Sequence, residues 1–529
     1  MPNGVRNTVG QLTDQVRGLH IDMSLKMWTA ATTGTPEALD SAAKSRAAWM
    51  RYWADPEQYR QVKAWDEDGE AGDDAQLRRI VHLLHLFFAE NQRDPATIDE
   101  MTELQKVLDS AYTNFRAEVD GRRLTANDVD EILRHENDSA KRRAAWEAGK
   151  EIGPRVADQI RRLAELRNDG ARRMGYDNFH RMSLILNEID PDWLFTLLDD
   201  LAAKTEEPFR RMKAEMDSEL SQRFGVPVED LMPWHYADPF FQRAPMLGDY
   251  DFDALFQQRD LVALATATYD GLGMDVRDIL GRSDLYEREG KDQHAFCTTI
   301  DREGDVRTLC NLKPSLRWME TLLHELGHGV YDKYIPTELP WLLRSPAHTL
   351  STEALAMLMG ANVLDPEWHA RILGSSSAEA EKAGTLGQAR FRLEEVIFAR
   401  WVMVMVHFER LMYEDPSRDL NALWWDLVQK YQLLLKPEGR ERKPDWATKY
   451  HIALAPAYYQ NYLLGRMMSL QWDGWLRRHV GGIVGRAAAG EFFRERVFAL
   501  GATLPWNEGL EFATGEKLIP DHFVRQFAD

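Results

Sequence analysis

Hydrophobic residues along this chain recur mostly at the spacing of an amphipathic helix. Apolar side chains three and four positions apart share one helix face, while arginine and glutamate fill the opposite face. The pattern predicts long helices over most of the chain. Two such stripes are Leu104, Val107, Leu108 and Ala111, and then Val156, Ile160, Leu163 and Leu166.

The clearest strand pattern lies near the middle of the chain. Residues 294–300 and 306–311 have the pattern of two short strands, and residues 301–305 between them have the composition of a turn. We predict a hairpin there, whose turn places Cys297 and Cys310 opposite each other. A single disulfide is geometrically conceivable, but two reduced thiols are the expected state, because two cysteines are too few for a disulfide scaffold.

No Pro/Gly/Ser linker, internal repeat or low-complexity tract divides the chain. Turn chemistry appears near residues 67–74 and 436–445, and neither stretch marks a domain boundary. We therefore predict one mainly α-helical domain over residues 1–529, arranged in two lobes around a cleft.

The overall charge excludes two classes of partner. The 529 residues are 44% hydrophobic and 28% charged, which is typical of a globular protein, and they carry a net charge of −20. Such an acidic surface repels phosphate backbones and anionic lipid heads, so we expect neither nucleic acid nor a membrane as partner. The N-terminal residues lack an apolar stretch, and no later run of about 18 apolar residues occurs. We expect the chain to stay in the cytoplasm.

The main chemical signal is the pentapeptide His-Glu-Leu-Gly-His, in which His324 and His328 are four residues apart. Residues at that spacing share one face of a helix, and Ser315 before the motif could cap such a helix. Both imidazoles can then reach one metal ion, and with an open coordination position they suit zinc. Glu325 can reach a bound water without ligating the metal. The alternative is a solvated helix face with two ordinary histidines.

A catalytic zinc ion needs a third protein ligand. Glu353 follows His328 by 25 residues, in a second predicted helix that Ser351 or Thr352 would cap. Two packed helices could then present three ligands to one ion. Glu353 taken alone could equally be a surface carboxylate.

Further segments, in the same order and with similar spacing, make the chain resemble the angiotensin-converting-enzyme family of peptidyl-dipeptidases. The thimet-type oligopeptidases are close structural relatives of that family. The segments are His294-Ala295, residues 421–432 with their Trp-Trp and Lys-Tyr-Gln, residues 449–452 with Lys-Tyr-His-Ile, and residues 456–462 with their tyrosines. The likeness covers roughly residues 290 to 475, and the helical N-terminal part fits only in general character.

The resemblance implies a large two-lobed helical metallopeptidase, with a deep central cleft and a small β-hairpin region beside the active site. It implies one zinc ion per chain, held by His324, His328 and Glu353. Glu325 is then the general base, and Tyr462 helps to stabilise the oxyanion. The catalytic core spans about residues 290–475, and the helices of about residues 1–120 act as a lid that excludes folded proteins.

The same resemblance implies contacts to a peptide substrate. His294 and His451 would hydrogen-bond backbone carbonyls on either side of the cut bond, and Ala295 would offer its main chain to the peptide. Lys449 and Tyr459 would bind the C-terminal carboxylate, which restricts cleavage to the end of the peptide.

Three positions depart from the family pattern. The family's carboxylate site uses a glutamine in a Trp-x-Gln segment, whereas the nearest match here, residues 234–236, has none. Asn461 replaces the family's chloride-binding arginine, so we expect no chloride activation there. Met357 replaces a carboxylate four residues after the third ligand, and Glu320 is the candidate replacement for that anchor.

Three functions follow from this comparison. The first is zinc-dependent release of C-terminal dipeptides from short peptides, and Lys449 and Tyr459 favour it. The second is internal cleavage, as in the thimet-type oligopeptidases, which the missing glutamine favours. The third is a zinc-containing peptide-binding protein without turnover.

Overall fold

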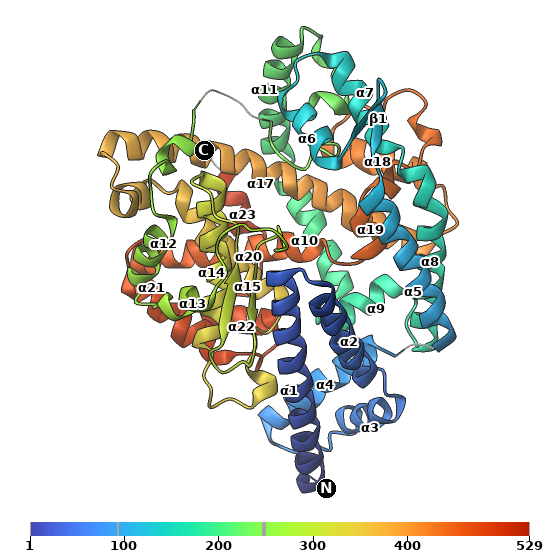
Figure 1. Ribbon diagram of the computed structural model, residues 1–529, viewed down its shortest axis with the longest axis vertical. Helices are drawn as coiled ribbons and strands as arrows, with labels where there is room; N and C mark the ends of the chain where they lie inside the picture. Colours follow the sequence, from blue (N-terminus) through green and yellow to red (C-terminus); the bar gives the residue numbers. More distant parts are fainter. Residues whose placement is uncertain (1, 93–94, 246–249, 528–529) are drawn as a thin grey trace.

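The computed structural model describes residues 2–92, 95–245 and 250–527, and it is mainly helical (Figure 1). The sequence prediction of a mainly α protein is therefore confirmed. Strands occur in the described residues only as two short antiparallel hairpins, β1–β2 and β3–β4. The same residues contain no helix whose length and apolar character would carry it across a lipid bilayer.

The elements of the first half are α1 (Pro2–Thr33), α2 (Pro36–Trp53), α3 (Pro56–Glu67), α4 (Ala75–Glu90), α5 (Pro95–Asn114), β1 (Ala117–Val119), β2 (Arg122–Leu124), α6 (Ala126–His135), α7 (Ser139–Lys150), α8 (Gly153–Arg173), α9 (Phe179–Leu186), α10 (Pro191–Lys204), α11 (Glu206–Phe224) and α12 (Leu261–Asp270).

The elements of the second half are α13 (Arg277–Arg282), β3 (Phe296–Thr299), β4 (Val306–Leu309), α14 (Leu316–Tyr334), α15 (Thr349–Ala361), α16 (Pro366–Trp368), α17 (Ser377–Glu414), α18 (Leu420–Gln432), α19 (Tyr450–Leu454), α20 (Gln460–Val480), α21 (Ala487–Phe492), α22 (Trp506–Thr514) and α23 (Asp521–Val524).

Many of these helices begin where a polar cap precedes a proline. Asp55 and Asp190 each accept two backbone N–H bonds at the start of α3 and α10, and a proline follows each of them. A capping side chain satisfies N–H groups that have no partner within the helix, and proline at the first helical position removes one of them. The ends of these helices are thus encoded locally.

Buried apolar side chains form two clusters. The smaller one joins helices α1 to α4 to a short turn at Trp341–Leu343, and the larger one runs through the rest of the described chain. Helix α5 contributes Met101 and Leu108 to the larger cluster. The helices that share a core with α1 therefore end at α4, before the predicted lid boundary near residue 120.

Three helices cross at small residues in the second half of the chain. A Cβ atom added to Gly327 of α14 would lie 2.8 Å from the Cα of Ala356 in α15. A Cβ added to Gly465 of α20 would lie 3.1 Å from the carbonyl oxygen of Leu350 and 3.4 Å from the Cβ of Glu353. Helices can approach this closely only where one of them has no side chain in the way.

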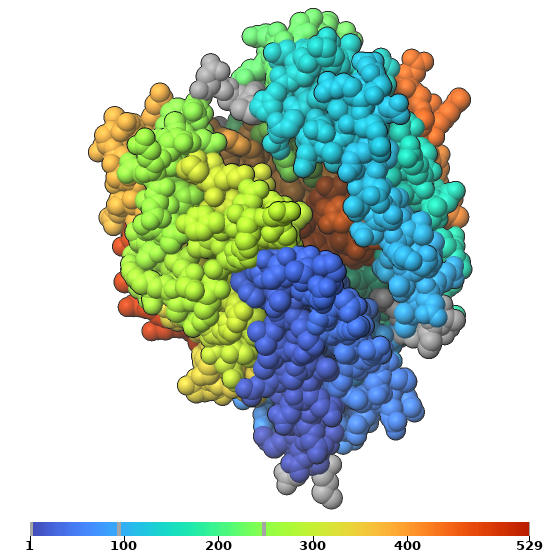
Figure 2. Space-filling view, in the orientation of Figure 1, coloured from blue at the N-terminus to red at the C-terminus, as the bar shows by residue number. Residues whose placement is uncertain are grey.

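Figure 2 shows a hollow in one face of the molecule, with α1 and α2 (dark blue) on one rim and the segment around β3 (yellow-green) beside them. The floor of the hollow has the orange-red colour of the chain near α19. Helix α1 is attached to the β3–β4 segment: Arg17 pairs with Glu303 at 2.8 Å, and the Asp292 N–H donates to the Ala31 carbonyl at 2.8 Å.

The predicted hairpin is confirmed, but its register differs from the expected one. Cys297 pairs with Thr308, so Cys310 lies two positions beyond the residue that faces Cys297. The prediction that the cysteines stand opposite each other is wrong, because Thr299 pairs with Val306 and residues 300–305, rather than 301–305, lie between the paired strands. Both cysteines are free thiols, as expected.

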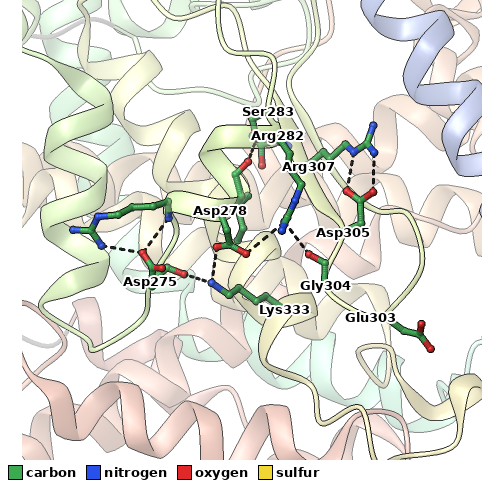
Figure 3. Close-up of polar contacts among 12 residues, drawn as sticks. Asp275, Asp278, Arg282, Ser283, Glu303, Gly304, Asp305, Arg307 and Lys333 are labelled. Atoms are coloured by element: carbon green, nitrogen blue, oxygen red, sulfur yellow. Dashed lines mark hydrogen bonds and ion pairs between the residues drawn. The ribbon is translucent and has the colours of Figure 1, made fainter.

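The C-terminal end of α14 is fixed to the same hairpin by charged groups (Figure 3). Lys333 donates to the Asp278 carboxylate and to the Asp275 carbonyl, each at 2.6 Å. Arg282 lies 3.4 Å from Asp278 and donates to the Gly304 carbonyl in the hairpin turn at 2.9 Å. These bonds tie α13, α14 and the turn into one unit.

Candidate functional site

His324, His328 and Glu353 converge in the structure. The Nε2 atoms of the two histidines lie 3.2 Å apart, and the Glu353 Oε2 atom lies 3.6 Å from the first and 4.0 Å from the second. Ligand atoms at about 2.0–2.1 Å from a tetrahedral zinc ion stand about 3.3 Å from one another. The two nitrogens and one oxygen therefore fit a zinc ion with an open fourth position.

Helix α14 presents both imidazoles as predicted. Ser315 caps the helix by accepting the Trp318 N–H, and Leu322, Leu323 and Leu326 are buried on its inner side. Four-residue spacing then places His324 and His328 on one face.

Helix α15 begins earlier than the sequence suggested. Its first residue is Thr349, and the His348 side chain caps it by accepting the Leu350 N–H at 3.0 Å. The prediction of a cap at Ser351 or Thr352 is therefore wrong, because the imidazole of His348, three residues before Ser351, supplies the acceptor. Glu353 consequently lies in the second turn of the helix.

His328 is held by a neighbour that the sequence reasoning did not assign. The Thr352 hydroxyl lies 2.7 Å from Nδ1 of His328 and can fix the orientation of that ring. Glu320, the expected replacement for the missing carboxylate, is exposed and makes no hydrogen bond to His324 within the described chain. The role of Thr352 could not be recognised from sequence alone, because a Ser or Thr next to a Glu is a common pair.

Burial sets the protonation of this group. It lowers the pKa of His324 to about 3 and that of His328 to about 4, so both imidazoles are in the neutral form that binds metals. Burial also raises the pKa of Glu325 to about 8, and neighbouring Glu353 adds to the effect. The same cause raises the pKa of Glu353 to about 7, although the charge of Arg466 acts in the opposite direction.

Three tyrosines form a cluster, and Glu353 interacts electrostatically with two of them, Tyr458 and Tyr462. The rings of Tyr458 and Tyr459 lie 5.2 Å and 5.5 Å from the ring of Tyr462. Burial, then these two neighbours and the Glu353 carboxylate, raise the pKa of Tyr462 above its usual value. The phenol therefore stays protonated at neutral pH and can donate a hydrogen bond.

Lys449, Tyr459 and His451 form a second group, in which Lys449 sits in an aromatic cage. Its Nζ atom lies 5.1 Å, 5.4 Å and 5.5 Å from the rings of Phe240, Trp401 and Tyr459. The His451 ring lies 5.0 Å from that of Tyr459, and burial together with Lys449 lowers the pKa of His451 to about 4.

Gln242 completes this second group, and the sequence reasoning missed it. The Lys449 ammonium donates to the Gln242 side-chain oxygen at 3.0 Å. Residues 234–236, where the glutamine was sought, are buried instead against other helices, with His235 bonded to Ser139 at 2.6 Å. No local pattern marks Gln242, because only the fold brings it to Lys449 across 207 residues.

His294 and Ala295 are not drawn into either group. The His294 side chain is 94% exposed and lies 3.4 Å from Asp292, while Ala295 packs partly buried against the main core. Strand β3, which follows them, packs against α14. The two residues therefore lie near α14 without a described contact to His324, His328 or Glu353.

Comparison with known proteins links both halves of the chain to peptidases. The family model of angiotensin-converting enzyme matches residues 4–235, and the model of peptidase family M3 matches residues 278–529. Angiotensin-converting enzyme of Haematobia irritans exigua is 22% identical over 295 residues, which are 52% of this chain and 46% of that protein. The chain thus spans about half the length of this curated relative. The sequence reasoning placed the specific likeness in the C-terminal half, whereas the angiotensin-converting-enzyme model matches the N-terminal half.

Proposed function

We propose that the chain, whose two halves match the family models of angiotensin-converting enzyme and of peptidase family M3, is a zinc metallopeptidase. It would hydrolyse short peptides at the meeting point of α14, α15 and α20. The observation that carries the proposal is the convergence of His324, His328 and Glu353 within 4.0 Å. A donor set of two half-buried imidazoles and one half-buried carboxylate is suited to a catalytic zinc ion.

These three residues would hold one zinc ion, and Thr352 would orient His328. When bound, zinc supplies a Lewis acid that polarises the scissile carbonyl and lowers the pKa of a bound water. The neutral state of both imidazoles favours this role.

Glu325 is the general base in this proposal. It lies on α14 directly after His324 in the sequence. Its side chain is buried and interacts electrostatically with Glu353. In its carboxylate form, which the positive charge of a bound zinc ion would favour against the effect of burial, it takes a proton from the attacking water and passes it to the leaving amine. Because the Glu325 side chain is buried, the proton that it carries does not exchange readily with bulk water.

Tyr462 is the proposed donor to the oxyanion. Its phenol is protonated and shares its surroundings with Glu353, at the N-terminal end of α20. A preformed donor beside the metal ligands stabilises negative charge as it develops on the carbonyl oxygen.

Release of C-terminal dipeptides is the mode that we favour. Lys449 and Gln242 together offer a cation and an amide to a peptide carboxylate, with Tyr459 beside them. A charge-assisted bond to that carboxylate fixes the distance between the peptide end and the cut. Gln242 supplies a glutamine amide at this site, and the apparent absence of such a glutamine was the argument for internal cleavage. His451, beside Tyr459, would contact the substrate backbone.

Internal cleavage is the second candidate, because the M3 family model matches residues 278–529, the half that holds the zinc ligands. Digestion of a peptide mixture by the zinc-loaded protein, followed by mass spectrometry, separates the two modes. Stepwise loss of dipeptides supports the first mode and internal cuts support the second. Absence of any hydrolysis, with zinc bound, would support a peptide-binding protein without turnover.

A further inference from the structure

A cavity lies further along α15 and α20, beyond the proposed zinc ligand Glu353 on α15 and the proposed oxyanion donor Tyr462 on α20. It has a volume of about 350 Å³ and is lined by the later turns of α15 and α20, by α17 and by residues 525–526. Helix α23, just before those residues, packs on α20, so four parts of the chain border the cavity, which opens to solvent. Its lining does not include His324, His328, Glu353 or Tyr462.

The cavity is unusually basic for this acidic protein. Its described lining contains four arginines and two aspartates, in a chain of net charge −20. Both aspartates, Asp365 and Asp473, are engaged by Arg477, at 3.4 Å and 2.7 Å. The other three arginines are Arg392, Arg466 and Arg525.

Two of those arginines are exposed and form no ion pair among the described residues. Arg392 lies on α17 and Arg525 follows α23, and both side chains border the opening of the cavity. Asp521 interacts electrostatically with Arg525, but the two form no salt bridge among the described residues. An incoming anion therefore meets two guanidinium groups that no carboxylate of the described chain pairs with.

Arg466 forms the inner wall, and one of its nitrogens lacks a partner. Its Nε atom lies 2.9 Å from Glu395, yet its Nη1 atom is buried without a hydrogen bond. An unpaired buried charged donor is costly, and an acceptor inside the cavity would satisfy it. The ring of Phe391 lies 5.1 Å beneath this guanidinium. Further apolar surface comes from Leu358, Ala361, Leu364, Leu470 and Ile483.

We propose that this cavity binds a small organic anion, in which one carboxylate or phosphate group is attached to an apolar body. The arginines would take the charged group, because guanidinium groups match carboxylate and phosphate oxygens in geometry. The apolar body would lie on Phe391 and the leucines. A volume of about 350 Å³ is in the range of sites for such ligands.

The site is connected to the zinc ligands through Arg466. The charge of Arg466 acts on Glu353 and on His324, in addition to pairing with Glu395. An anion bound to Arg466 adds negative charge on the side of the metal ligands, which favours a bound cation. Because such coupling is reciprocal, zinc should also strengthen binding of the anion.

The test is calorimetric titration of the zinc-loaded full chain with phenyl phosphate and with benzoate. Inorganic phosphate and benzyl alcohol serve as probes that carry only the charge or only the apolar body. We expect one-to-one binding of at least one aromatic anion, at least tenfold tighter than either partial probe. Absence of binding by both anions, or equal binding of benzyl alcohol, would overturn the proposal.

Substitution locates the site without touching the proposed catalytic residues. Arg392→Gln combined with Arg525→Gln should weaken binding of the aromatic anion at least tenfold. Arg390→Gln is the matched control, since Arg390 lies on the same helix, pairs with Glu394 and does not line the cavity. Equal weakening by the control, or displacement of the anion by a peptide substrate, contradicts a separate site. Titration of zinc-free protein tests the coupling, and equal affinity with and without zinc would remove the role given to Arg466.

Discussion

Gly327 of α14 lies directly against Ala356 of α15, so that a Cβ atom on Gly327 would come within 2.8 Å of the Ala356 Cα. This contact sets the separation of the two helices that carry the proposed zinc ligands. The glycine between Glu325 and His328 therefore has a structural role in bringing Glu353 to the histidines.

Gly327→Ala should push α15 away from α14 and impair the metal site. Overpacking of this kind costs about 1–3 kcal/mol, and we expect a lower melting temperature together with at least tenfold weaker zinc binding, measured by competition with a chelating dye. Gly170→Ala in α8 is the control, because a Cβ there meets nothing within 4 Å. Unchanged zinc affinity in Gly327→Ala would show that the helix separation does not control the site.

Thr352→Val should weaken zinc binding by removing the hydroxyl that orients His328. Loss of an outer partner of a ligand histidine typically costs about 10- to 100-fold in metal affinity or activity. The same competition assay measures it, and Thr349→Val is the control, since Thr349 is exposed at the start of the same helix.

Glu325→Gln should retain zinc and lose hydrolysis. The amide cannot accept the proton from water, and general base catalysis contributes about 10²- to 10⁴-fold to such reactions. Metal analysis and peptide digestion of the same sample check both parts. A variant that still cleaves peptides at the wild-type rate would exclude Glu325 as the base.

Lys449→Met should impair only peptides with a free C-terminal carboxylate. Loss of a hydrogen bond to a charged group is worth about 1.5–3 kcal/mol, which corresponds to a rise in KM of about 10- to 100-fold. The matching C-terminal amides should be cleaved as by the wild type. Gln242→Leu should act in the same direction, because Gln242 holds the ammonium at 3.0 Å. Equal loss on acids and amides would point to a structural effect.

The pH dependence of KM should differ between peptides with a free C-terminal carboxylate and the matching C-terminal amides. Burial lowers the pKa of Lys449 to about 8, although Asp238 and Asp130 act against the shift and Arg243 adds to it. Burial lowers the pKa of His451 to about 4, so that neighbour stays neutral in this range. The Lys449 ammonium is charged below pH 8 and loses its proton as the pH rises through that value. KM for free-acid peptides should therefore rise above about pH 8, whereas the ratio of acid to amide KM should stay constant at lower pH.

Local signals explain which parts of the fold were predictable. Helix α14, its cap at Ser315 and the β3–β4 hairpin follow from periodicity and turn composition, since each depends on residues close in sequence. The hairpin register and the start of α15 were not predicted correctly. A single residue in the turn shifts every pair, and the His348 cap depends on a side chain that rarely has this role.

The sequence by itself determined the helical class and the spacing that lets His324 and His328 share one helix face. It also offered Glu353, Lys449 and Tyr462 as candidates through their order along the chain. Only the tertiary structure decided that Glu353 meets the histidines, that Thr352 supports His328, and that Gln242 reaches Lys449. The physical reason is that a helix fixes neighbours within a few residues. Contacts between distant segments depend on how closely the helices pack, and here glycines at their crossings set that distance.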